Sequence, residues 1–96
     1  MVIDEPQYAL GIVLRGEGAP IVLVTLDCLG VYNRAYDRFA NALADAAETS
    51  PKRVLITSVH RHDSPWHEPD VQRLIDEHKL NYAFCDVAHF DRVMAD

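Results

Sequence analysis

Two short apolar segments with an amphipathic segment between them constrain the fold of this chain most. Residues 21–26 are almost entirely apolar or β-branched, and residues 54–59 form a second run of the same kind. Between them, apolar residues recur at intervals of three and four over residues 34–48, which predicts a helix. The order strand, helix, strand is typical of a βαβ unit, in which the two strands lie parallel in one sheet.

The central helix is expected to begin after Asn33, whose side chain suits an N-cap position. One apolar stripe is expected to face the sheet. Its members are Ala35, Phe39, Ala42, Leu43 and Ala46. The run over residues 21–26 is nearly continuous in apolar residues, which predicts a central strand covered on both faces.

The flanking segments complete the predicted fold. Residues 8–14 are expected to form a strand, and residues 15–20, with two glycines and a proline, a turn that makes a β-hairpin. Further along, Pro69 suits the first position of a helix, and Asp86 suits the cap of another. The predicted fold class is α/β, a small mixed sheet with a β-hairpin and a parallel βαβ unit, covered by two or three helices.

Length and composition exclude several classes of protein. The chain has 96 residues, which predicts a single domain with a limited core. Its net charge is −6 and its longest basic run is Lys52-Arg53, so no nucleic-acid partner is expected. Cys28 and Cys85 are isolated in sequence, a pattern that indicates neither a zinc knuckle nor a disulfide framework.

No transmembrane segment is expected, because the longest apolar run is far shorter than the ~20 residues that a membrane span needs. The N-terminal residues lack the basic and apolar regions of a secretory signal. As written, the chain is expected to be soluble and cytoplasmic. It would be exported if a signal peptide preceded it in a longer product.

A cluster of polar residues follows the second apolar run. His60 and His62 are two apart, so on a strand they would project to one side, with Arg61 on the other. Imidazole is the commonest protein ligand for zinc, and open α/β sheets place ligands at the carboxyl ends of their strands. The pair therefore predicts a zinc half-site, although two solvated loop histidines would have the same pattern.

Acidic residues are expected beside this pair. Asp27 ends the first parallel strand, so it should lie near the histidines as an additional ligand or as a hydrogen-bond partner of an imidazole. An aspartate that only forms a turn or caps a helix would show the same sequence pattern. Asp63 adds a second carboxylate in the same role. His67 and Glu68 are ligand types too, but they are expected to be surface residues of a loop.

With these residues in view, the chain resembles the N-terminal region of the neutral/alkaline ceramidase family. Members of that family show a strand ending in an acidic residue, then a helix, then a strand running into a His-Thr-His-Ser-Gly-Pro motif. Here residues 22–27, the helix after Asn33, and residues 53–65 follow that order. The resemblance extends from Tyr8 to the end of the chain, and its specific motif is His60-Arg61-His62-Asp63-Ser64-Pro65.

This resemblance implies a zinc-dependent hydrolase that cleaves the N-acyl bond of a lipid amide. In the family the first histidine of the motif is a zinc ligand and the second lies in the same site, which would correspond to His60 and His62. Arg61 stands where the family has threonine, and Asp63-Ser64 where it has Ser-Gly, which adds a carboxylate and removes a glycine.

The family's further ligands are a histidine, a glutamate and a tyrosine from much later in the chain. A catalytic zinc normally has three protein ligands and a water molecule. Residues 1–96 are therefore expected to be one domain that is part of a larger ceramidase-like hydrolase, or a shortened relative, with no complete catalytic site and no activity alone.

Two other interpretations remain open. A metallohydrolase of the amidohydrolase type also begins its metal site with His-x-His at a strand end, but it would need an extended barrel. The other is a small non-catalytic α/β module that assembles as a homo-oligomer. Its first strand would leave a sheet edge exposed for pairing with another chain.

Overall fold

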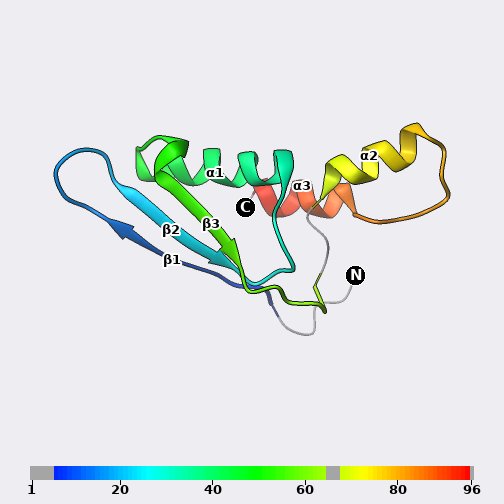
Figure 1. Cartoon of the computed structure of the whole chain (residues 1–96), viewed down its shortest axis with the longest axis horizontal. Helices are drawn as coiled ribbons and strands as arrows, with labels where there is room; N and C mark the ends of the chain where they lie inside the picture. Colours follow the sequence, from blue (N-terminus) through cyan, green and yellow to red (C-terminus); the bar gives the residue numbers. More distant parts are fainter. Residues whose placement is uncertain (1–5, 65–67, 96) are drawn as a thin grey trace.

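The computed structural model describes residues 6–64 and 68–95 of the chain. These residues form three strands and three α-helices (Figure 1). In chain order these are β1 (Ala9–Leu14), β2 (Ile21–Leu26), α1 (Asn33–Ala47), the 3₁₀ turn η1 (Pro51–Arg53), β3 (Val54–Ser58), α2 (Pro69–Glu77) and α3 (Val87–Ala95).

The three strands form one mixed sheet in the order β1-β2-β3. β1 and β2 make the predicted antiparallel hairpin, with Ala9 opposite Leu26. β2 and β3 are parallel, with Val22 opposite Val54, and α1 connects them as the predicted βαβ unit requires. The predicted α/β class, with its hairpin and parallel unit, is therefore confirmed.

The core lies between α1 and one face of β2 and β3. Its buried residues are Val22, Leu26, Cys28, Ala40, Ala44, Val54 and Ile56. The predicted stripe on α1 was only partly right, because Ala42 and Ala46 are exposed whereas Ala40 and Ala44 are buried. Apolar residues are frequent enough on this helix to suit two overlapping stripes, and periodicity alone does not choose between them.

The observed buried stripe of α1 is rotated about the helix axis relative to the predicted stripe. In this orientation the helix accepts a hydrogen bond from the sheet. Tyr36 is partly buried against the core, and its hydroxyl accepts the backbone N–H of Ile56 at 3.4 Å. β3 is an edge strand, so this N–H has no partner strand on that side. The observed stripe therefore places a side chain where it satisfies an exposed strand edge.

The expectation that β2 is covered on both faces was wrong. Val22 and Leu26 point toward α1 and are buried, whereas Ile21 is 40% exposed and Leu55 of the neighbouring β3 is 54% exposed. All helices of the described residues lie on one side of the sheet (Figure 1). The sheet therefore has an open apolar face, although β2 is central in the strand order.

The two later helices begin where the sequence predicts. Pro69 occupies the first turn of α2. Asp86 precedes α3 and accepts the backbone N–H of His89 at 2.9 Å, as an N-cap residue does. α2 packs against α1 and α3, and Phe90 of α3 makes an edge-to-face contact with Phe39 of α1.

Gln72 organises the connection between α2 and α3. Its amide donates to the carboxylate of Asp76 at 2.9 Å and to the carbonyl of Tyr82 at 3.3 Å. Its carbonyl oxygen accepts the backbone N–H groups of Phe84 at 2.6 Å and Cys85 at 2.9 Å. One buried side chain thus satisfies polar backbone groups along a segment that has no regular secondary structure.

Candidate functional site

The segment after β3 stays beside the segment after β2. The backbone N–H of Val59 donates to the carbonyl of Leu26 at 3.2 Å, and that of Arg61 to the carbonyl of Cys28 at 3.1 Å. The strand was expected to continue through Val59 into the histidines, but β3 ends at Ser58. His60 has a φ of 61°, in the left-handed region, which a strand residue does not adopt.

The structure brings the two histidines of the motif together. The ring centroids of His60 and His62 are 4.9 Å apart, and the rings meet edge to face at 84°. Strand alternation does not explain this placement, because the left-handed turn at His60 has replaced the extended backbone. The predicted proximity of the two imidazoles is therefore observed, but it arises from a turn.

A hydrogen bond defines which nitrogen of His60 carries a proton. Nδ1 lies 3.0 Å from the carbonyl oxygen of Leu29. A carbonyl only accepts, so Nδ1–H is the donor, and in the neutral ring Nε2 keeps its lone pair. A histidine whose Nδ1–H is held by a backbone carbonyl presents Nε2 in the form that binds a metal or accepts a proton.

Asp27 lies beside this segment, as expected for the ends of two parallel strands, but its partner is Arg61. The Arg61 guanidinium donates to Asp27 Oδ2 at 2.9 Å and to the Asp63 carboxylate at 2.6 and 3.3 Å. These contacts lower the pKa of Asp63 and raise that of Arg61. Both carboxylates are therefore engaged by one cation.

The donor set fits half of a zinc site. Among residues 6–64 and 68–95, no three His, Cys, Asp or Glu side chains are grouped so that they would hold one metal ion. His67, the nearest further histidine in sequence, lies outside the described residues. His60 and His62 can supply two imidazole nitrogens, and a catalytic zinc would need a third protein ligand.

Cys28 is buried next to this segment. Its side chain is 2% exposed, and its Sγ lies 3.7 Å from the carbonyl oxygen of Gly30. Burial raises the pKa of the thiol, so the reactive thiolate is a minor species at neutral pH. The chemistry that this segment can offer is therefore that of its imidazoles.

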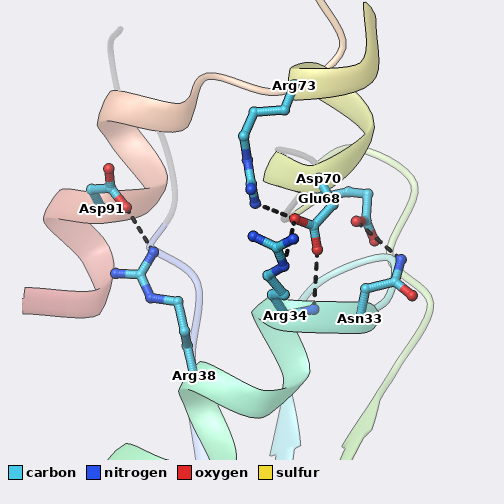
Figure 2. Close-up of polar contacts among 7 residues, drawn as sticks. All are labelled: Asn33, Arg34, Arg38, Glu68, Asp70, Arg73 and Asp91. Atoms are coloured by element: carbon cyan, nitrogen blue, oxygen red, sulfur yellow. Dashed lines mark hydrogen bonds and ion pairs between the residues drawn. The ribbon is translucent and has the colours of Figure 1, made fainter.

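The polar contacts between α1 and α2 were not predicted (Figure 2). Asn33 was expected to cap α1, but it is the first helical residue, with a φ of 52°. Its side chain donates to Glu68 at 3.2 Å, and Asp70 of α2 accepts the backbone N–H of Arg34 at 3.1 Å. The cap of α1 therefore comes from another helix, which local sequence does not reveal.

Glu68 was expected on the surface, but it is 4% exposed. Its carboxylate is held by Asn33, and its place immediately before α2 brings it against the start of α1. The only sequence signal for this position is the neighbouring Pro69, which indicates a helix start and says nothing about burial.

A shallow depression of about 400 Å³ lies on the open face of the sheet. Apolar side chains of the three strands surround the hydroxyls of Thr25 and Thr57, which are 2.8 Å apart. The residues that line it include no titratable side chain. This depression offers no acid, base or metal ligand.

Comparisons with known proteins add no relatives to this description: no family model matches the chain, and no curated protein or solved structure shows significant similarity. The resemblance to the ceramidase family therefore rests on the sequence motif and on the order of the elements around it. Within the described residues, no helix has the length and apolar character that crossing a membrane requires.

Proposed function

We propose that this chain carries the two-histidine metal half-site of a ceramidase-like, zinc-dependent hydrolase that acts on N-acyl bonds of lipid amides. His60 and His62 are the metal ligands. The site lacks further ligands within the described residues, so the isolated chain binds zinc weakly and does not turn over substrate.

The observation that carries this proposal is the hydrogen bond between His60 Nδ1 and the carbonyl of Leu29. It holds the imidazole in the tautomer that leaves Nε2 available. The His62 ring lies beside it, at a centroid distance of 4.9 Å. An edge-to-face pair of rings is also ordinary aromatic packing, so it is the oriented Nδ1–H that favours a ligand role.

The site lies where a parallel βαβ unit places ligands, at the carboxyl ends of β2 and β3. Zinc bound there would polarise an amide carbonyl and lower the pKa of a bound water molecule to about 7. The choice of a lipid amide comes from the family resemblance. The apolar depression on the sheet is compatible with an acyl chain but does not identify one.

Calorimetric zinc titration of the purified chain tests the proposal. The wild-type protein should bind one zinc ion, and a His60→Ala/His62→Ala double variant should lose that binding. A His78→Ala/His89→Ala variant is the matched control, because it removes one histidine that follows α2 and one in α3, and it should bind as the wild type does. Equal binding by the wild type and the first variant would contradict the proposal.

An activity assay tests the proposal that the isolated chain does not turn over substrate. The chain alone should release no fatty acid from an N-acylated substrate in the presence of zinc. Measurable hydrolysis that requires zinc and His60 would show that this chain contains a complete catalytic site. That result would contradict the proposed half-site.

A second candidate function, assembly with another copy of the chain, is favoured by the exposure of β1. All six of its residues are exposed, and none is charged. Tyr8 accepts the N–H of Asp27 on the β2 side, so alternation in an antiparallel ladder directs the N–H and C=O groups of Ala9, Gly11 and Val13 toward the free edge.

This edge suits a second copy because it is self-complementary. With a twofold axis at Gly11, Val13 of one chain would pair with Ala9 of the second copy, and two three-stranded sheets would join into one. An uncharged strand is also the part of a chain of net charge −6 that a second copy can approach with least repulsion.

Sedimentation velocity over a range of concentrations tests this assembly. The wild type should dimerise, and Ile12→Lys should remain monomeric, because it places a like charge across the pairing edge. Leu80→Lys is the control, since Leu80 is 61% exposed in the loop between α2 and α3. A wild type that is monomeric at every concentration would contradict assembly.

A further inference from the structure

We infer that Arg61 is a positioning residue for the histidine pair, acting through the loop that follows β2. This inference rests on the proposed metal half-site. Arg61 lies between the two histidines in sequence, and its guanidinium binds Asp27 on the neighbouring loop. Both Arg61 and Asp27 are largely shielded, with side chains 23% and 25% exposed.

Three successive residues of that loop are bonded to the segment that carries the histidines. Asp27 receives the Arg61 guanidinium at 2.9 Å, the Cys28 carbonyl receives the Arg61 N–H at 3.1 Å, and the Leu29 carbonyl faces His60 Nδ1 at 3.0 Å. The hydrogen bond that orients His60 is thus one of these three contacts between the two segments, and Arg61 makes the other two.

Asp63 fixes the guanidinium from the other side. Its carboxylate accepts from both Nε and a terminal nitrogen of Arg61, a two-point contact that holds the planar group in one orientation. The guanidinium therefore links Asp27, which follows β2, to Asp63, which follows His62. We assign Asp27 and Asp63 a role through Arg61 and not as metal ligands.

Zinc affinity distinguishes this role from a simple charge effect. Arg61→Gln removes a cation and frees two carboxylates, so electrostatics alone would make zinc bind more tightly. Loss of a group that orients the ligands should instead weaken metal binding, typically about 10- to 100-fold. We expect zinc binding by Arg61→Gln to be about tenfold weaker, and equal or tighter binding would overturn the inference.

A double-variant cycle separates positioning from ligation by Asp27. Asp27→Asn alone should weaken zinc binding by a factor similar to that of Arg61→Gln. In the Arg61→Gln background it should have no further effect, because its role depends on the guanidinium. A full additional loss in that background would identify Asp27 as a direct ligand and overturn the assignment.

Arg73→Gln is the matched control for the loss of an ion-paired arginine. Arg73 lies on α2 and pairs with Asp70 of the same helix, so the zinc affinity of Arg73→Gln should equal that of the wild type. If Arg61→Gln folds poorly, Arg61→Lys serves in its place. It keeps the charge but loses the two-point contact, and it should still weaken zinc binding.

A measurement without metal separates failure of this inference from failure of the proposed function. Nuclear Overhauser effects between the ring protons of His60 and His62 should be strong in the wild type and reduced in Arg61→Gln. If the wild type binds no zinc but this loss is observed, the half-site fails and the positioning role stands. Unchanged ring contacts in a folded Arg61→Gln would overturn the positioning role.

Discussion

The two sides of α1 are held by different kinds of interaction. Toward the sheet, α1 presents buried alanines such as Ala40 and Ala44 to the apolar side chains of β2 and β3. Toward α2 and α3, it presents Asn33, Arg34 and Arg38, which bind carboxylates (Figure 2). The first interface depends on apolar area, and the second combines directed polar contacts with a single buried aromatic residue, Phe90 of α3.

The difference follows from what each partner can bury. A sheet offers a continuous apolar surface, and alanines let a helix approach it closely. α2 and α3 are short helices with few buried residues, which are Pro69 and Gln72 in α2 and Phe90 in α3. Their positions are therefore set by a few specific contacts, and changes at those contacts should act locally.

The largest effect is expected from Phe90→Ala. Phe90 is fully buried, contacts Phe39 edge to face and lies under the Arg38 guanidinium at 4.9 Å. Truncating a buried phenylalanine costs about 4 kcal/mol of unfolding free energy. Hydrogen exchange should show loss of protection in α3, with β2 and β3 still protected. Uniform loss across the sheet would show that the two interfaces unfold as one unit, and Tyr82→Ala, at an exposed residue, is the control.

The second largest effect on stability is expected from Gln72→Met. The variant keeps the size of the side chain but leaves the N–H groups of Phe84 and Cys85 without their acceptor. Phe84 is partly buried and Cys85 is buried, so the loss of this acceptor is expected to lower the unfolding free energy by about 3 kcal/mol, measured by urea denaturation. Gln7→Met, at an exposed residue, should have no effect. A neutral Gln72→Met would mean that the connection between α2 and α3 does not depend on this side chain.

Ala44→Leu tests the sheet side of α1. Ala44 is fully buried against the core, so a larger side chain should force the helix away from the sheet and cost about 2 kcal/mol. Ala46→Leu makes the same change at an exposed position of the same helix and should be nearly neutral. The reverse ranking in thermal denaturation would support the stripe predicted from sequence and contradict the observed rotation of α1.

Asp70→Ala should have the smallest effect of the four. It removes the carboxylate that accepts the backbone N–H of Arg34, and the loss of such a cap costs about 1 kcal/mol. Asp70→Asn keeps an acceptor and should recover part of this loss, whereas Asp91→Ala breaks an exposed ion pair and should cost less. Equal effects of Asp70→Ala and Asp91→Ala in urea denaturation would show that the cap between helices contributes no more than a surface ion pair.

Local signals in the sequence were sufficient for most of the fold. β2 spans residues 21–26, as predicted, and Pro69 and Asp86 mark the starts of α2 and α3. The proximity of Asp27 to the histidine segment also followed from sequence, because parallel strands bring their carboxyl ends together. These inferences succeed because hydrophobic period, proline geometry and helix capping act over a few residues.

The candidate site was predictable in its residues but not in its contacts. The sequence pointed to His60, His62, Asp27 and Asp63 as neighbours. It did not show that Arg61 binds both carboxylates, because a side chain that joins two loops depends on where the second loop runs. The zinc ligand role of the histidine pair remains a prediction.

The sequence by itself determined the order, type and approximate bounds of the elements, and the parallel pairing of β2 and β3. Only the tertiary structure decided which stripe of α1 is buried, which face of the sheet stays open, and that Asp70 caps a helix other than its own. The physical reason is distance along the chain. Asp70 and Arg34 are 36 residues apart, and contacts of that kind depend on how complete elements pack.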